Sequence, residues 1–193
     1  MFRRKRDPIA EIFSSIPTLQ TERLTLRAMR RSDRQDMYEY ASDPSVTRYL
    51  LWDIHPNEEY TGRYLDYVVS RYRIGDFTDW AVTVTETGKM IGTCGFTRID
   101  ADHRKGEVGY VLNPAYWGQG IAAEAVRAVL HFAFFRLKLN RMEAKFIRGN
   151  ERSLRVMEKC GMQFEGYQRE AMLIKGQYCD IGYASILRSE FPE

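Results

Sequence analysis

Apolar positions along the chain change their spacing several times, and each change marks a different kind of element. Residues 21–29 alternate apolar and polar side chains, which is the pattern of a half-buried strand. Residues 57–76 place tyrosine, leucine and valine side chains three and four positions apart, so they predict an amphipathic helix. The period of two returns at residues 80–85 and 90–99, which predicts a hairpin that turns near Thr87-Gly88.

The other predicted elements follow from the same periodicities and from residues that cap or stop helices. In chain order they are a helix at residues 31–43, a strand at 105–112, a long helix at 120–139, a strand at 141–147, a helix at 150–161 and a hairpin at 162–187. Strands and helices in this order predict a mixed, mostly antiparallel sheet with helices on its faces.

Length and composition are those of one globular domain. The chain has 193 residues and no linker rich in Pro, Gly or Ser, so we expect a single domain at residues 17–193 after a basic arm at residues 1–16. Three widely spaced cysteines indicate neither a disulfide framework nor a CxxC metal site. Because no long apolar run and no secretory signal is present, we expect a cytoplasmic chain without membrane contact.

Charge adds little to this picture. The net charge is +3, and basic residues gather at the start of the chain, from Arg3 to Arg6. Such a run can contact nucleic-acid phosphates, but it is more often a solvated tail. No nucleic-acid-binding motif accompanies the run, so nucleic acid is not the expected main ligand. The three histidines share no metal-ligand spacing, so we expect no metal site.

The segment NPAYWGQGIAAEA, residues 113–125, sets two glycines just ahead of a predicted helix, which is typical of an anion site. A P-loop would need a Lys-Ser/Thr pair where Ile121-Ala122 stands. A dinucleotide fingerprint would need its glycines directly after the strand, but NPAYW intervenes and Pro114 ends the strand. Two interpretations remain: the pyrophosphate loop of an acyl-CoA-dependent transferase, or glycines that only form a tight turn.

Several separated motifs resemble the GNAT N-acetyltransferases, and within them the RimJ/RimL-type branch. In chain order the motifs are an opening TERLTLR, the strand GEVGYVL, the loop WGQGIA, the helix start NERS and a closing GQYCD. The resemblance runs from about residue 18 to residue 189. It implies the GNAT fold, a mixed α/β architecture whose mostly antiparallel sheet of six to seven strands is flanked by about four helices. It also implies an acyltransferase enzyme that uses acetyl-CoA and transfers acetyl directly to a primary amine.

Coenzyme A would then be held largely by backbone groups. The resemblance places its pyrophosphate against the N–H groups of residues 117–122, where the helix dipole is favourable. It also implies that the strand at residues 105–112 splays from its neighbour and pairs with pantetheine near Val111 and Asn113. Asn150 would bond a pantetheine amide, act as a helix cap, or do both. The expected acetyl-CoA contacts are Val111, Leu112, Asn113, Trp117, Gly118, Gln119, Gly120, Ile121, Ala122, Asn150 and Ser153.

Acetyl transfer needs a base, an oxyanion donor and a proton donor for the departing thiolate. The resemblance favours Glu107 as the base, unless it is a solvated or salt-bridged strand residue. Glu170 is a second candidate, because it should share a strand face with Met172, where the RimL-like base would fall; solvent is the third. The oxyanion donor is implied to be the Val111 N–H. Ser153 would serve the thiolate, unless it only shares the cap of its helix.

The resemblance implies a protein α-amino group as the acceptor, because the RimJ/RimL branch acetylates the N-termini of ribosomal proteins. Tyr49 and Trp52 would wall the acceptor site, or else belong to the core. A small amine acceptor and a non-catalytic acyl-CoA-binding module are the alternatives. The basic arm suggests contact with the ribosome, and both a monomer and a homodimer are compatible with the sequence.

Overall fold

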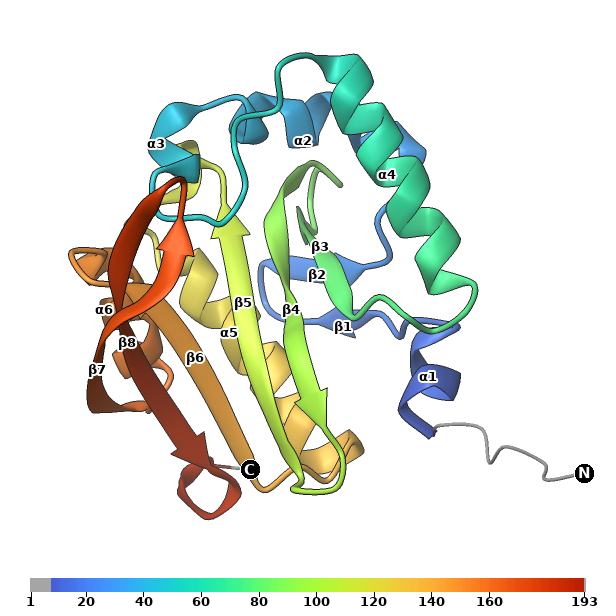
Figure 1. Ribbon diagram of the computed structural model, residues 1–193. Coiled ribbons are helices and arrows are strands. Elements are labelled where there is room, and N and C mark those ends of the chain that lie inside the picture. The colour runs from blue at the N-terminus through green and yellow to red at the C-terminus, as the bar shows by residue number, and fades with distance from the viewer. Residues whose placement is uncertain (1–7, 193) are drawn as a thin grey trace, which may run out of the picture.

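The structure is built around one mixed sheet. The computed structural model describes residues 8–192, so the basic run from Arg3 to Arg6 lies outside the described residues. Within residues 8–192 the sheet has eight strands in the order β1-β2-β3-β4-β5-β6-β8-β7, and only the β5–β6 pair is parallel (Figure 1). The strands are β1 (Leu19–Gln20), β2 (Leu24–Arg27), β3 (Asp79–Val84), β4 (Met90–Asp100), β5 (Lys105–Leu112), β6 (Arg141–Ile147), β7 (Gln163–Ile174) and β8 (Gln177–Leu187).

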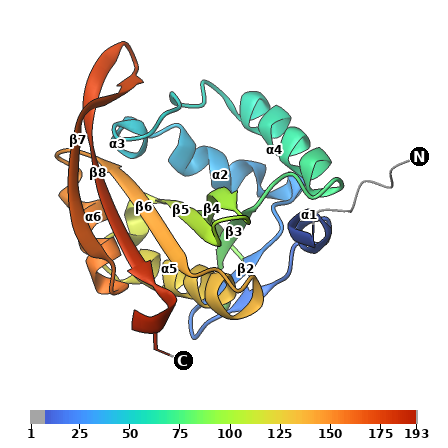
Figure 2. The same cartoon turned by 60° about the horizontal axis from the view of Figure 1, so that its bottom comes forward.

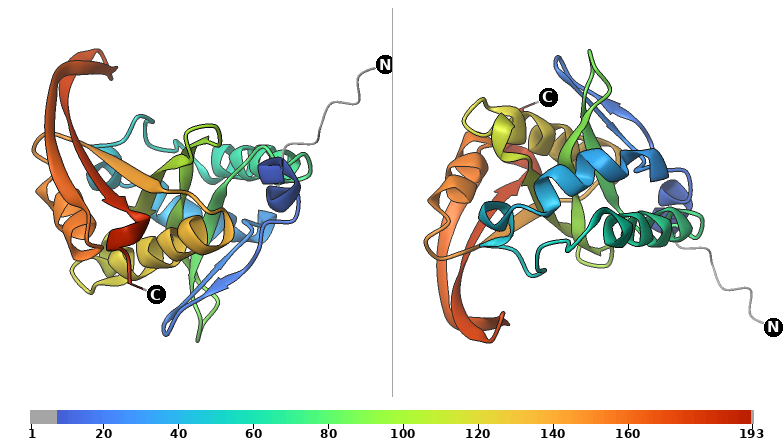
Figure 3. Two further views of the ribbon diagram at one scale, coloured as in Figure 1. Left: turned by 90° about the horizontal axis from the view of Figure 1, so that it is seen from below. Right: turned by 90° about the horizontal axis from the view of Figure 1, so that it is seen from above.

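Helices cover both faces of this sheet, as Figures 2 and 3 show. One face carries α2 (Arg34–Ala41), α3 (Pro44–Thr47) and α4 (Glu58–Tyr72), and the other carries α5 (Ile121–His131) and α6 (Glu151–Lys159). Each face buries its own apolar cluster, because alternate residues of the strands point to opposite sides. In residues 8–192 no helix is long and apolar enough to cross a membrane.

The predicted α/β class and the antiparallel bias are confirmed, but the described chain has more elements than expected. The eighth strand is β1, whose two residues pair with β2 and are too short to show a period. The additional helix is α3, with four residues, while α1 (Pro8–Phe13), with six, is a short helix within the expected arm. The predicted long helix also changes character, since α5 continues into a π-helical stretch at Phe132–Arg136. The turn near Thr87-Gly88 joins β3 to β4, as predicted.

Part of the segment expected to be a basic arm, residues 8–13, packs against the core. Phe13 at the end of α1 is fully buried, and its ring lies 5.5 Å from the ring of Trp80 and 6.0 Å from that of Phe96. The described part of the expected arm therefore packs with the sheet. The sequence did not predict this contact, because the segment is too short to show a helical period.

β5 and β6 diverge, which is the feature of the sheet that positions the site. Lys105–Glu107 of β5 pair with Arg141–Glu143 of β6. Beyond these residues each strand continues for several residues without pairing with the other. Figure 1 shows the two strands meeting at one end of the sheet and separating toward the other. The predicted splaying of the strand at residues 105–112 is thus confirmed, and a gap flanked by strand backbone results.

Candidate active site

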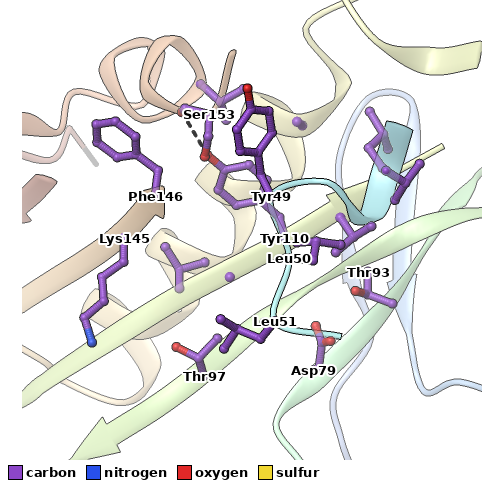
Figure 4. A pocket seen from close by; sticks show the side chains of 18 of the residues that line it. Tyr49, Leu50, Leu51, Asp79, Thr93, Thr97, Tyr110, Lys145, Phe146 and Ser153 are labelled. Carbon is purple, nitrogen blue, oxygen red and sulfur yellow. Dashed lines mark hydrogen bonds between the residues drawn. The ribbon is translucent and has the colours of Figure 1, made fainter. Parts of the chain in front are cut away.

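A cavity of about 1800 Å³ opens where β5 and β6 separate. Its walls include the ends of both strands, the first turn of α6 and the loop ahead of α5. Residues 45–55 cover it from the side of α3, and side chains of β3 and β4 form its floor (Figure 4). The cavity therefore extends from the glycine loop to the divergent strands. The motifs that form these two parts are separated along the chain.

Two glycines in left-handed conformation shape the loop ahead of α5. Gly118 has a φ of 77° and Gly120 a φ of 78°, which residues with a side chain rarely adopt. A Cβ on Gly118 would meet no atom within 4 Å, so the backbone conformation itself requires glycine there. Gly120 is the N-cap of α5, so the first N–H groups of the helix point out of its N-terminal end without partners in the helix. This arrangement suits an anion.

The row of donors begins one residue later than the sequence analysis expected. The Trp117 N–H donates to the carbonyl oxygen of Pro114 at 3.1 Å, so it does not face the loop. The Trp117 indole Nε1 donates to the carbonyl oxygen of Leu112 at 2.7 Å, which ties the loop to the end of β5. The guanidinium carbon of Arg152 lies 4.9 Å from the centre of the indole ring and brings positive charge beside the loop.

The other predicted loop residues differ in what their side chains do. Ile121 and Ala122 line the cavity, and most of the Ile121 side chain is buried in the core. Gln119 is exposed, and its amide donates back to the carbonyl oxygen of Ala115 at 2.9 Å. Gln119 itself is not among the residues that line the cavity.

The backbone of β5 faces the gap at other residues than those expected. The Asn113 N–H donates to the carbonyl oxygen of Ile91 in β4 at 2.7 Å. Since backbone direction alternates along a strand, the N–H of Val111 also faces β4, and those of Tyr110 and Leu112 face the gap. The predicted oxyanion donor at Val111 and pantetheine pairing at Val111 and Asn113 remain predictions, and this register favours the neighbouring N–H groups of Tyr110 and Leu112 for both roles. The sequence does not show which of the two alternating sets of backbone N–H groups faces the gap.

Asn113 and Asn150 both cap helical turns, but only Asn150 keeps a donor for a ligand. The Asn113 side chain accepts from the Ala115 N–H at 3.0 Å and donates to Glu39 at 2.9 Å, and the residue is buried. The Asn150 Oδ1 accepts from the Ser153 N–H at 3.3 Å, while its Nδ2 has no hydrogen-bond partner in the described chain. Asn150 lines the cavity, so capping and ligand binding are compatible there.

Tyr110 and Ser153 form a hydroxyl pair on the cavity wall. The Tyr110 hydroxyl donates to the carbonyl oxygen of Ser153 at 3.0 Å, and it lies 2.8 Å from the Ser153 Oγ (Figure 4). Burial raises the pKa of the Tyr110 phenol above its ordinary value, so the phenol keeps its proton at neutral pH. Ser153 was a predicted site residue and Tyr110 was not, although the tyrosine stands in the strand motif GEVGYVL.

Glu107 is an ion-paired residue in this structure. Its carboxylate lies 2.5 Å from the Lys145 Nζ and accepts a hydrogen bond from the Thr97 hydroxyl at 2.7 Å. The salt-bridged alternative considered for Glu107 is therefore present, and a role as base would first require this pair to open. Nothing in the sequence indicated a site role for Lys145, because its position in β6 predicts only a half-exposed strand residue.

Both predicted aromatic residues of the acceptor side line the cavity. Tyr49 lies in the covering segment and is among the side chains that line the cavity (Figure 4). Trp52 also packs against the apolar cluster under α2 and α4, and its ring lies 5.4 Å from that of His55. Trp52 therefore both lines the cavity and packs in the apolar cluster.

Glu170 does not line the cavity, which makes it a poor second candidate for the base. A bulge in β7 lies between Gln168 and Met172, and Glu170 in it has a φ of 49°. The bulge breaks the alternation on which the prediction relied, so Met172 lines the cavity while Glu170 is exposed and donates its N–H to Asp180.

Two further features bear on the chemistry. Asp79 at the start of β3 lines the cavity, and its Oδ1 is buried without a hydrogen-bond partner in the described chain. Asp79 was not a predicted site residue, because nothing in the local sequence distinguishes it from any aspartate at the end of a strand. Across residues 8–192, no group of three or more His, Cys, Asp or Glu residues is placed to hold a metal ion.

Comparison with known proteins points to one family. A family model described as an acetyltransferase (GNAT) domain matches residues 23–163. The uncharacterized N-acetyltransferase p20 of Bacillus licheniformis is 36% identical over 90% of this chain and 98% of its own length. The crystal structure of a GNAT-family acetyltransferase from Bacillus anthracis superposes with a TM-score of 0.80 at 30% identity, over 90% of this chain and 100% of that one.

More distant relatives differ in the acceptor that their names state. The "putative ribosomal N-acetyltransferase YdaF" of Bacillus subtilis is 27% identical over 88% of this chain and 94% of its own length. The spermidine N(1)-acetyltransferase of Vibrio cholerae is 26% identical over 87% of this chain and 95% of its own length. The two identities are too similar to separate a protein acceptor from a small amine.

Proposed function

Since the chain belongs to the GNAT acetyltransferase family, we propose that it transfers the acetyl group of acetyl-CoA to the α-amino group of a protein. Membership makes it an acyltransferase enzyme of a family that uses acetyl-CoA. The observation that carries the proposal is the gap between β5 and β6, which opens directly beside the glycine loop at the start of α5. Both halves of an acyl-CoA can then lie in one continuous cavity.

The pyrophosphate would be held by the N–H groups from Gly118 onward, at the N-terminus of α5. Pantetheine would run along the gap, where Asn150 and the gap-facing N–H groups of Tyr110 and Leu112 supply donors. Cationic side chains of α6 line the same part of the cavity and would add favourable charge: Arg152, Arg155 and Lys159.

Transfer requires that charge on two atoms be stabilised as the thioester reacts. A gap-facing N–H of β5 would donate to the oxygen as it becomes an oxyanion. The Tyr110–Ser153 pair would donate to the sulfur as it leaves, and the phenol is protonated at neutral pH, as a proton donor must be. Product release then leaves an amide and free coenzyme A.

A protein acceptor is supported by the surroundings of the cavity. The covering segment carries two large apolar side chains that remain exposed, Leu51 and Ile54, and the β7–β8 hairpin carries Leu173. The two regions meet where the Lys175 ammonium donates to the carbonyl oxygen of Thr47 at 2.8 Å. Exposed apolar groups near a cavity mouth suit contact with more of the acceptor than its amine.

Location and ribosome contact are parts of the same proposal. The three cysteines, Cys94, Cys160 and Cys179, are free thiols, which supports a cytoplasmic enzyme.

Basic residues 3–6 would attract ribosomal RNA near a ribosomal-protein acceptor. Deleting residues 1–7 should then lower activity on ribosomes at low salt and leave activity on a free peptide unchanged.

The test of the function is thiol release from acetyl-CoA with a panel of amines. The panel contains N-terminal peptides of ribosomal proteins, polyamines, amino acids and aminoglycosides. Turnover on the peptides supports the proposal, whereas turnover on a small amine alone keeps the reaction and replaces the acceptor. A protein that binds coenzyme A and turns over no amine would be a non-catalytic acyl-CoA-binding module.

A further inference from the structure

Two glycines in the floor of the cavity face each other across neighbouring strands. Gly95 of β4 pairs with Gly109 of β5, and on its other side Gly95 pairs with Asp79 of β3. A Cβ on Gly95 would lie 2.7 Å from the Asp79 Oδ1. A side chain on Gly95 would therefore collide with the backbone and the carboxylate of Asp79, so glycine at this position lets Asp79 lie close against β4, the strand that pairs with β5.

Asp79 differs from the other carboxylates around the cavity in its surroundings. The carboxylates that line the cavity in the described chain are Asp53, Asp76, Asp79, Glu107 and Glu151. Asp53, Asp76 and Glu107 each lie close to a lysine or arginine, and Glu151 is exposed to solvent. Asp79 has no ion-pair partner in the described chain, and its Oδ1 is shielded from solvent. A carboxylate oxygen that is shielded from solvent and unpaired is unfavourable unless the group is protonated or a ligand supplies the partner.

A second buried polar atom without a partner lines the same cavity. The Tyr40 hydroxyl on α2 makes no hydrogen bond in the described chain. Tyr72 on α4, by contrast, donates to the carbonyl oxygen of Asp79 at 2.6 Å and so fixes the backbone of the carboxylate. Two unpartnered groups in one cavity indicate that a polar group of a ligand completes this region.

Burial raises the pKa of Asp79 to about 7, although the Thr93 hydroxyl and the Trp80 N–H partly oppose the shift. The titratable groups near the carboxylate are Tyr40 of α2, Tyr64 and Tyr72 of α4 and Cys94 of β4. Burial raises the pKa of each of them above its ordinary value, so all four are neutral at pH 7. A carboxyl group that titrates near pH 7 suits proton transfer at that pH.

We propose that Asp79, and not Glu107, is the catalytic residue that receives the protonated amine of the acceptor and takes its proton, directly or through one water. This assignment rests on the proposed acetyl transfer. The Asp79 carboxylate takes one proton from the ammonium group and becomes a carboxylic acid. The nitrogen lone pair then forms a bond to the thioester carbon, and the carbon–sulfur bond breaks.

The remaining protons balance as follows. The thiolate takes a proton from the Tyr110–Ser153 pair and leaves as free coenzyme A, while the new amide nitrogen loses its second proton and returns it to that pair. Asp79 releases its own proton to solvent before the next cycle. One ammonium group and one thioester thus yield one amide, one thiol and one proton.

The kinetic test compares Asp79→Asn with Glu107→Gln on an amine that the wild-type protein acetylates. Asp79→Asn should lower kcat/KM about 100-fold or more. The rise of kcat/KM with pH should move from near pH 7 to the pKa of the acceptor amine, about 8 for a peptide N-terminus. Glu107→Gln should keep the wild-type midpoint.

Two results would overturn the assignment in different ways. A wild-type protein that is active while Asp79→Asn keeps its rate and its midpoint refutes the role of Asp79 alone. A wild-type protein that acetylates no amine refutes the proposed function, and the assignment with it.

Stability provides a readout that does not depend on activity. The folded pKa of Asp79 is raised above the unfolded value, so the folded state holds a proton that the unfolded state has lost between about pH 4 and pH 7. The free energy of unfolding of the wild type should therefore fall, relative to Asp79→Asn, as the pH rises from 5 to 8. An Asp79→Asn variant that is less stable than the wild type at pH 8 would show a carboxylate satisfied by the fold and overturn the proposal.

The matched control is Asp66→Asn on α4. Asp66 is an exposed carboxylate outside the cavity, and its Oδ1 lies 2.6 Å from the Nε of Arg31. The same change from carboxylate to amide should leave the rate, the pH midpoint and the pH dependence of stability close to those of the wild type.

Discussion

The Tyr110 hydroxyl lies 2.8 Å from the Ser153 Oγ, so that one hydroxyl pair joins β5 to the first turn of α6 across the gap. Both residues line the cavity between the two elements. Either hydroxyl can therefore pass a proton to a group bound in the gap, with the other supplying the replacement.

The first prediction concerns this pair. Tyr110→Phe should lower kcat about 10- to 100-fold, because the departing thiolate loses a proton donor, and should leave the KM for acetyl-CoA nearly unchanged. Steady-state thiol release measures both constants.

The double variant Tyr110→Phe with Ser153→Ala tests whether the two hydroxyls act as one unit. Its loss should be little greater than that of Tyr110→Phe alone. Losses that multiply in the double variant would show that the two residues act separately.

The second prediction concerns the glycine loop. Gly118→Ala should lower the free energy of unfolding by about 1 kcal/mol, because alanine is strained at a positive φ. It should weaken coenzyme A binding by more than this strain accounts for, since the added Cβ occupies space that no protein atom fills. Thermal denaturation and calorimetric titration measure the two effects separately.

Gly88→Ala is the matched control for this loop. Gly88 also has a positive φ, of 71°, and open space around its Cβ, but it lies in the β3–β4 turn away from the cavity. The variant should lose similar stability and keep its affinity for coenzyme A. Equal losses of affinity in the two variants would contradict a phosphate site at Gly118.

The third prediction concerns the Glu107–Lys145 pair. Glu107→Gln should lower kcat/KM less than about tenfold, because the carboxylate is engaged by Lys145 and Thr97. Lys145→Met should also be mild in the same thiol-release assay. A loss of about 100-fold in Glu107→Gln with normal folding would return the role of base to Glu107.

The fourth prediction concerns the anchoring of α1. Phe13→Ala should destabilise the protein by about 3–5 kcal/mol, because it empties a fully buried site among aromatic rings. Ser15→Ala, at an exposed position two residues away, should change stability by less than about 0.5 kcal/mol. Chemical denaturation of the three proteins measures the difference, and equal stability would place α1 outside the cooperative core.

The sequence by itself determined the features that depend on neighbours along the chain. The hairpin through Thr87-Gly88, the buried helix after Gly120 and the cap at Asn150 follow from periodicity and local backbone preference. The glycine loop belongs with them, because a positive φ and a helix N-terminus are local properties.

Only the tertiary structure decided which side chains meet and which way the strands face. Lys145 reaches Glu107 because a short parallel pairing joins β5 to β6, and Tyr110 reaches Ser153 across 43 residues of chain. A bulge removed Glu170 from the strand face it was expected to share, and Gly95 on the neighbouring strand leaves room for Asp79 in the floor of the cavity. Strand register and long-range packing set these contacts, and no local pattern of residues encodes either one.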